Sequence, residues 1–206
     1  MSAVLERVRI RNLGLAEYAR TAEAMREFTA RRGAETPDEL WLLEHPPVYT
    51  LGVGADPAHG PRRDNGIPVV RCGRGGEITY HGPGQVVLYT LVDLARRGLA
   101  VKRFVWLLEQ SVIELLGGCG GRKEGAPGVY VAGAKIAALG LRVSRGRAYH
   151  GLALNVDMDL SPFAAIDPCG IPGLTVTQMR DLGYSGSSEE VGDSLAQILL
   201  SRIEDA

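Results

Sequence analysis

Hydrophobic residues recur at helical spacing in three segments of the chain. The apolar positions repeat every three to four residues within 15–31, 102–116 and 188–203, which predicts three amphipathic helices. Gly117 and Gly118 follow the second segment and should end that helix. Ser188 is the expected N-cap of the third helix.

Shorter apolar runs lie between these segments and predict β-strands. The expected strands are residues 40–43, 48–51, 69–71, 86–91, 129–131, 136–143 and 150–156. Frequent Gly and Pro mark residues 52–68 and 161–173 as loops. Because the strands form hairpin-like pairs between helices, we expect an α+β fold with a mixed β-sheet flanked by helices. No repeat or linker divides the chain, so residues 1–206 are expected to form one domain.

Composition and charge exclude several classes of function. The chain has 23 basic and 24 acidic residues, which argues against a broad nucleic-acid-binding surface. No apolar run is long enough to cross a membrane, and the N-terminus lacks a signal-peptide pattern. The three cysteines form no CxxC pair, so neither a disulfide framework nor a structural zinc site is expected. These features together predict a cytoplasmic protein.

The glycine-rich segment Arg74–Gln85 precedes the apolar run 86–91 and is the most informative part of the sequence. Glycines beside a strand mark a bend or a close approach of the backbone to a ligand. Here they occur together with Arg74, Thr79, Tyr80 and His81, and a turn alone has no need of those four groups. We interpret the segment as a binding loop; the alternative is a glycine-rich hairpin with incidental polar residues.

Two residues are candidates for chemistry. Cys169 is framed by prolines and glycines, which should display its thiol on a stiff loop, and a nearby cation would favour the reactive thiolate. Lys135 is the one charge among small and apolar residues. It is either partly desolvated and suited to proton transfer, or a surface lysine at a hairpin tip. Cys72 and Cys119 are expected to pack as small buried hydrophobes.

Small residues recur in the strand expected at 150–156. Gly151 and Ala153 alternate with larger apolar residues, so they should fall on one face. That face would either leave room for a linear apolar ligand or pack closely against a helix. His81, His150 and Cys169 lack the spacing of metal ligands, so no metal is expected.

Taken together, these segments resemble the lipoyl(octanoyl) transferase family. The matching motifs occur in the family's order; they are His45–Gly52, Arg74–Gln85, Gly125–Val131, Lys135–Gly140, His150–Val156 and the stretch from Asn155 through Pro168-Cys169-Gly170. The resemblance implies the fold of biotin and lipoate ligases for a single catalytic domain, with Cys169 as nucleophile and Lys135 as the residue that tunes its thiol. It also implies a substrate pocket, lined by Arg74, Gly75, Gly76, Glu77, Ile78, Thr79, Tyr80, His81, Ala138, Leu139, Gly140, Gly151, Leu152 and Ala153.

The reaction implied by the resemblance is a two-step acyl transfer. An octanoyl group would pass from acyl carrier protein to Cys169 and then to a lysine of a lipoyl domain. The implied acceptors are the E2 subunits of 2-oxoacid dehydrogenases and the glycine cleavage H protein. No cofactor is expected, because the intermediate is another thioester and needs no ATP. A monomer is expected. Amides near Gly170, Gly75 or Gly76 could hold the developing oxyanion.

Three other functions remain open at this point. An ATP-dependent lipoate–protein ligase of the same fold would need a phosphate-binding loop, and only Arg74-Gly75-Gly76 could contribute to one. A cysteine hydrolase would pair Cys169 with His81 or His150, and an acyl-binding module would leave Cys169 idle. For docking of the acidic carrier protein we expect two candidate groups: Arg142, Arg145 and Arg147 beside Lys135, or Arg62 and Arg63.

Overall fold

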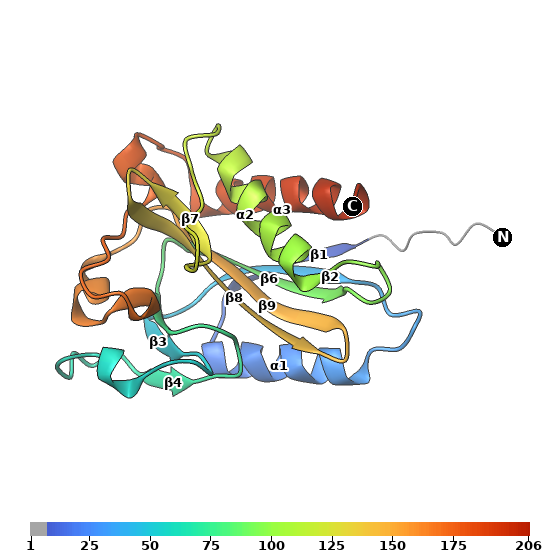
Figure 1. The fold of residues 1–206 in the computed structure, drawn as a ribbon, viewed down its shortest axis with the longest axis horizontal. Helices are drawn as coiled ribbons and strands as arrows, with labels where there is room; N and C mark the ends of the chain where they lie inside the picture. Colours follow the sequence, from blue (N-terminus) through green and yellow to red (C-terminus); the bar gives the residue numbers. More distant parts are fainter. Residues whose placement is uncertain (1–7) are drawn as a thin grey trace.

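The computed structural model describes residues 8–206. In this part of the chain, three α-helices pack with a six-stranded and a three-stranded β-sheet (Figure 1). The strand order of the large sheet is β1-β2-β6-β9-β8-β7. Its strands are β1 (Arg9–Leu15), β2 (Glu39–Glu44), β6 (Gln85–Asp93), β7 (Gly128–Val131), β8 (Ala134–Ser144) and β9 (Arg147–Asn155). The pair β1–β2 is parallel and the other pairs are antiparallel, so this sheet is mixed.

Helices cover both faces of the large sheet. Helices α2 (Val101–Leu115) and α3 (Ser188–Glu204) lie on one face, and α1 (Tyr18–Arg31) lies on the other (Figure 1). Strand β6 is buried along its whole length. Its Val86 and Leu88 pack into the core beneath α2 and α3, whereas Val87 and Tyr89 pack beneath α1, as the two-residue period of a strand requires.

The smaller sheet has the order β4-β3-β5 and forms a separate core. It consists of β3 (Val48–Leu51), β4 (Val69–Arg71) and β5 (Ile78–His81). Tyr49 and Tyr80 pack there against Phe163 and Ile166, which belong to the segment leading to Cys169. This sheet therefore supports the loop that carries the candidate nucleophile.

The predicted α+β class and mixed sheet are confirmed, and all seven predicted strands and three predicted helices form. The first helix begins at Tyr18 rather than at residue 15, because Leu15 ends β1, a strand that the apolar pattern did not predict. The predicted N-cap of α3 was wrong by one residue. Ser187 is the cap, and it forms a reciprocal capping box with Glu190.

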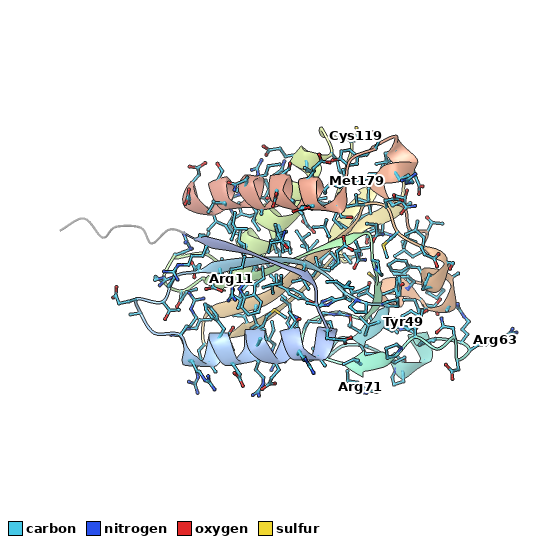
Figure 2. The ribbon with its side chains drawn as sticks, turned by 180° about the vertical axis from the view of Figure 1, so that it is seen from behind. Arg11, Tyr49, Arg63, Arg71, Cys119 and Met179 are labelled. Carbon is cyan, nitrogen blue, oxygen red and sulfur yellow. The ribbon has the colours of Figure 1, made fainter. Side chains whose placement is uncertain are left out.

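Three further expectations need correction. Residues 78–81 of the glycine-rich segment form β5 rather than loop, because they pair with β3 from Leu51↔Ile78 to Val48↔His81. The loop 161–173 contains two short 3-10 helices, Ser161–Ala165 and Pro168–Gly170. Cys119 is exposed rather than buried, at the outer edge of the molecule (Figure 2); Cys72 is half-buried.

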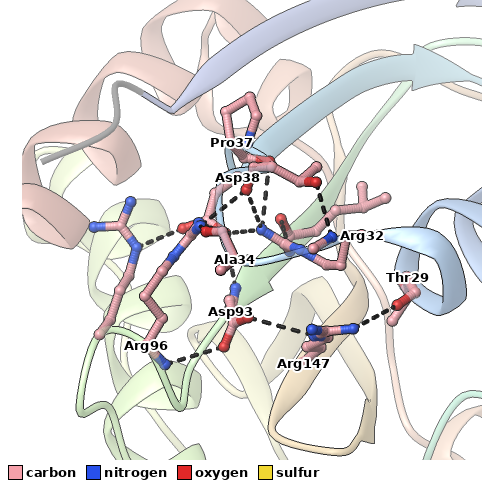
Figure 3. A network of polar contacts seen from close by, with 12 residues as sticks. Thr29, Arg32, Ala34, Pro37, Asp38, Asp93, Arg96 and Arg147 are labelled. Carbon is pink, nitrogen blue, oxygen red and sulfur yellow. Dashed lines mark hydrogen bonds and ion pairs between the residues drawn. The ribbon is translucent and has the colours of Figure 1, made fainter.

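A buried ion-pair network joins α1, β2 and β6 (Figure 3). Asp38 is fully buried, and its carboxylate accepts from Arg32 at 2.5 Å, Arg96 at 2.9 Å and Arg97 at 2.6 Å. Its Oδ1 also accepts from the amide of Asp93. These contacts hold the pKa of Asp38 below its usual range, against the opposing effect of burial.

Across residues 8–206, no helix combines the length and apolar character needed to cross a membrane.

Candidate active site

The ammonium of Lys135 donates to Sγ of Cys169 over 2.8 Å. Thirty-four residues of chain separate the two, and they come from different elements, the start of β8 and the 3-10 turn Pro168–Gly170. Among residues 8–206, Lys135 is the only side chain that hydrogen-bonds to Cys169. An ammonium in contact with sulfur stabilises the thiolate, which is the nucleophilic form of cysteine. The two predicted candidates for chemistry therefore meet.

The backbone holds Cys169 in an unusual conformation. Its φ is +59° and its ψ is 20°, the left-handed region, which costs a non-glycine residue about 1–2 kcal/mol. The preceding Asp167 is held by the guanidinium of Arg62 at 2.5 Å and by the carbonyl of His59 at 3.1 Å. A strained backbone conformation kept in place by surrounding contacts is typical of functional sites.

Lys135 is not the surface lysine that the sequence left possible. The residue is 4% exposed, and its ammonium also donates to the carbonyl of Pro127 at 2.8 Å. Its nitrogen lies 5.3 Å from the centre of the Tyr130 ring, a cation–π distance. Gly128 makes room for its stem, because a Cβ there would lie 2.4 Å from Cε of Lys135. The Lys135 ammonium is thus buried and points at the Cys169 sulfur.

Cys169 borders a cavity of about 390 Å³. Every residue of the predicted pocket lines this cavity except Tyr80, which packs between Tyr49 and Phe163 in the core of the small sheet. Tyr80 therefore lies outside the cavity wall, and the structure places it in the core of the small sheet together with Ile78. The cavity volume is in the range of small-molecule sites.

The small residues in the cavity wall are small for different reasons. A Cβ on Gly151 would lie 2.1 Å from the carbonyl oxygen of Leu88, so Gly151 allows β6 to approach and does not by itself widen the cavity. A Cβ on Gly140 would lie 3.0 Å from both Cδ of Arg74 and the carbonyl oxygen of Gly75. Ala153 also lines the cavity and, unlike the two glycines, carries a methyl group.

Arg74 is buried and ties the glycine-rich loop to β3. Its guanidinium donates to the carbonyl and hydroxyl oxygens of Thr50 and to the carbonyl of Gly75. No carboxylate pairs with it among residues 8–206. Because its donors are already bound to protein oxygens, this arginine is poorly placed to grip a phosphate, which counts against the ATP-dependent alternative.

Three histidines lie near the cavity and stay neutral. Burial is the main cause that lowers the pKa of His45 and His81, and it lowers that of His150 to about 3, with Arg74 adding to the effect. His150 has a φ of +64°, and its ring stacks on that of the adjacent Tyr149 at 5.1 Å. Consecutive strand residues normally point to opposite faces, so this backbone conformation turns His150 toward the cavity side.

Neither histidine proposed for a hydrolase reaches Cys169. His81 contacts Oε1 of Gln85 at 2.7 Å and the hydroxyl of Thr50 at 3.4 Å through its two ring nitrogens. Nδ1 of His150 has no partner among the described residues. In the same part of the chain, no group of three or more His, Cys, Asp and Glu is arranged to hold a metal ion. The site is therefore a thiol–lysine pair beside an apolar cavity.

Several lining residues were not among the predicted ones. Tyr18 of α1, Val87 and Tyr89 of β6, and residues 125–127 before β7 also border the cavity. The aromatic and aliphatic residues among them follow hydrophobic patterns that are typical of core residues, so their spacing gave no indication of a functional role.

Two amides that were expected to bind an oxyanion are already hydrogen-bonded within the protein. The amide of Gly75 donates to the carbonyl of Leu141, and the amide of Gly170 donates to the carbonyl of Asp167, so neither is free to bind an oxyanion.

Comparison with known proteins gives a consistent result. The family model of the lipoyl protein ligase A/B catalytic domain matches residues 17–200. An octanoyltransferase of Aromatoleum aromaticum is 58% identical over 193 residues, covering 92% of this chain and 83% of the relative. One of Dechloromonas aromatica is 55% identical over 198 residues, covering 95% of this chain and 96% of the relative.

The fold is similar to that of solved ligases. A bi-partite lipoate protein ligase from Thermoplasma acidophilum superposes with a TM-score of 0.77 at 17% identity, covering 97% of this chain and 84% of that one. Biotin protein ligase from Aquifex aeolicus gives a TM-score of 0.58 at 11% identity, covering 96% and 71%. At these identities the similarity concerns the fold alone.

Proposed function

The chain belongs to the lipoyl protein ligase A/B catalytic domain family and catalyses octanoyl transfer, and we propose that Cys169 and Lys135 carry out this reaction. The observation that carries the proposal is the 2.8 Å contact between the Lys135 ammonium and the Cys169 sulfur at the edge of the cavity. A buried cation that hydrogen-bonds to a thiol, with no histidine of residues 8–206 hydrogen-bonded to that thiol, favours nucleophilic catalysis through a thiolate–ammonium pair.

In the first step the Cys169 thiolate attacks the carbonyl carbon of the octanoyl thioester on the carrier protein. The new carbon–sulfur bond forms as the bond to the carrier sulfur breaks, and the Lys135 ammonium gives its proton to that departing thiolate. The products are octanoyl-Cys169, a free carrier thiol and a neutral Lys135 amine. One thioester replaces another, so the step requires no ATP.

In the second step the amine of the acceptor lysine attacks octanoyl-Cys169. Neutral Lys135 takes the proton that this nitrogen loses as the amide forms. The carbon–sulfur bond then breaks and restores the Cys169 thiolate beside the Lys135 ammonium. An arginine could not replace Lys135 here, because a guanidinium does not release its proton near neutral pH.

The octanoyl chain is proposed to lie in the cavity, against the glycine-rich loop and Ala153. Thirteen of the residues that the family resemblance implied border this cavity, as does Cys169; they are Arg74, Gly75, Gly76, Glu77, Ile78, Thr79, His81, Ala138, Leu139, Gly140, Gly151, Leu152 and Ala153. We assign Arg74 the role of holding the loop, since its donors bind Thr50 and Gly75.

The general partners are an acyl carrier protein as donor and lipoyl domains as acceptors. We extend this to the lipoyl domains of 2-oxoacid dehydrogenase E2 subunits and to the glycine cleavage H protein. A monomer with one catalytic domain is proposed to act in the cytoplasm, where three free cysteines stay reduced.

Intact-protein mass spectrometry after incubation with octanoyl carrier protein tests the proposal. The wild type should gain one octanoyl group without ATP, and Cys169→Ala should gain none. Cys72→Ala and Cys119→Ala are the matched controls and should react like the wild type. Acylation of Cys169→Ala, or activity that requires free octanoate and ATP, would assign the reaction to a different residue or to the ligase class.

A further inference from the structure

Four exposed cations lie on two segments that also contribute cavity-lining residues, Val105 of α2 and residues 125–127 before β7. Lys102 and Arg103 lie on the first turn of α2, and Arg122 and Lys123 lie on the loop before β7; all four are exposed. The guanidinium carbons of Arg103 and Arg122 lie 4.4 Å and 5.0 Å from the centre of the Trp106 ring. These five residues are called the Trp106 surface below.

The positive charge of the Trp106 surface is largely uncompensated. Within residues 8–206 only Arg122 pairs with a carboxylate, that of Glu109 at 2.9 Å. The second oxygen of Glu109 accepts from the amide of Gly128, so this acid is fully used inside the protein. Glu124 is the one further acid in the loop that carries Arg122 and Lys123. A chain with a net charge of −1 therefore has a locally cationic surface here.

Tyr130 connects this surface with the candidate site. The nitrogen of Lys123 lies 6.0 Å from the centre of the Tyr130 ring, and the nitrogen of Lys135 lies 5.3 Å from the same centre. The Tyr130 hydroxyl donates to the carbonyl of Ala126 at 3.0 Å, and Ala126 lines the cavity. A molecule bound to the Trp106 surface would thus lie beside the mouth that Cys169 borders.

The other arginines considered for docking are less suitable. Lys135 is the second residue of β8, whereas Arg145 lies just beyond the end of this 11-residue strand, roughly 30 Å away at about 3.3 Å per residue. Arg147 pairs with Asp93, and Arg62 is bound to Asp167 and the carbonyl of Ala164. Arg63 points away from the molecule (Figure 2). Arg142 donates to the carbonyl of Gly73 at 3.2 Å. The expectation that Arg142, Arg145 and Arg147 lie beside Lys135 was wrong, because they lie toward the opposite end of the β8–β9 hairpin.

We propose that the Trp106 surface docks the acidic carrier protein that delivers the acyl thioester. The inference rests on the proposed function, which requires a carrier-bound thioester to reach Cys169. Complementary charge steers such a partner and fixes its orientation. Trp and Arg are the residue types that contribute most to interface affinity, and here they are stacked on one another beside the mouth.

Binding of unacylated carrier protein to the enzyme tests the proposal independently of the chemistry. Arg103→Glu/Lys123→Glu should weaken the affinity about tenfold or more, and added salt should weaken wild-type binding. The control is Arg9→Glu/Arg20→Glu, which changes the net charge equally at exposed positions of β1 and α1 and should bind like the wild type. Equal affinities for both double variants would overturn the proposal.

Acylation rates separate docking from catalysis. Octanoyl-N-acetylcysteamine is a small thioester that needs no protein docking. Arg103→Glu/Lys123→Glu should be acylated by it at the wild-type rate and by octanoyl carrier protein more slowly. An equal loss with both donors, or a raised KM for the lipoyl domain alone, would contradict the proposal. Absence of acylation of the wild type by either donor would refute the proposed function, while the binding measurement would still decide the docking site.

Discussion

Gly128 leaves the space that the stem of Lys135 occupies. A Cβ at position 128 would lie 2.4 Å from Cε and 2.9 Å from Nζ of Lys135, distances that atoms do not tolerate. Gly128 also has a φ of +143°, which L residues rarely adopt. The missing side chain at this position on β7 leaves room for the stem of Lys135 and also for the carbonyl oxygen of Ala137, which would lie 2.6 Å from such a Cβ.

Gly128→Ala should therefore displace the ammonium from the thiol. We expect the rate of Cys169 alkylation at fixed pH and the rate of acyl transfer to fall about tenfold or more, since a shift of about 1 Å at a catalytic group has that scale of effect. Gly121→Ala is the control, because a Cβ there meets nothing within 4 Å. Unchanged alkylation in Gly128→Ala would show that the contact between Lys135 and Cys169 does not govern reactivity.

Ala153→Leu should shift the preferred chain length of the donor. Ala153 is 4% exposed and lines the cavity, so a larger side chain takes space that the far end of an acyl chain would use. Decanoyl thioesters should lose more kcat/KM than hexanoyl thioesters. Equal losses for every chain length would mean that Ala153 does not contact the acyl chain.

Buried neutral histidines should make the protein less stable in mild acid. In the unfolded chain the imidazoles protonate near pH 6.5, whereas burial lowers the pKa of His45, lowers that of His81 well below its usual value, and lowers the pKa of His150 to about 3. Because the unfolded state binds more protons in this window, the free energy of unfolding should decrease as the pH falls below about 6.5.

Urea unfolding between about pH 7 and 5 measures this slope, above the range in which carboxylates protonate. His150→Gln should show a smaller decrease in stability over this window than the wild type. The same slope in both proteins would contradict the assignment of His150 as a neutral buried group.

Asp38→Asn tests the ion-pair network of Figure 3. The substitution removes the carboxylate that Arg32, Arg96 and Arg97 share, and breaking such a buried pair typically costs about 3–5 kcal/mol of unfolding free energy. The folded variant should still acylate Cys169 normally, because the network is joined to the Arg147 end of β9 and not to the Lys135 end of β8. A loss below about 1 kcal/mol would mean that the arginines find other partners.

The hydrophobic pattern was sufficient for most of the fold. Strands such as β3 and β4 are short apolar runs bounded by Gly and Pro, and the predicted bounds match the structure. Strand β1 was missed because it is an edge strand with mostly exposed and intermediate positions, so no buried face marks its sequence. Strand β5 has only four residues, glycines lie on both sides of it, and Thr79 and His81 are polar although buried, so no apolar run indicates this strand.

The chemical residues were identifiable for a different reason. Pro168 and Gly170 around a lone thiol, and Lys135 among small residues, are local features that a sequence contains. The role of Gly128 depends on its contact with Lys135, and Arg62 and Asp167 pair across 105 residues of chain. No local sequence pattern indicates either relationship. That Lys135 and Cys169 act together was implied by the family resemblance. Their spacing in the sequence alone does not predict that they are in contact.

The most direct test of the account is a chase of the isolated acyl-enzyme. Octanoyl-Cys169 protein, freed of carrier, is mixed with a molar excess of unmodified lipoyl domain, and both masses are followed in time. We predict that the octanoyl mass leaves the enzyme and appears on one lipoyl-domain lysine in equal amount, and that Lys135→Met slows this transfer. An acyl-enzyme that hydrolyses to free octanoate, or that persists while added octanoyl carrier protein modifies the lipoyl domain, would contradict transfer through Cys169.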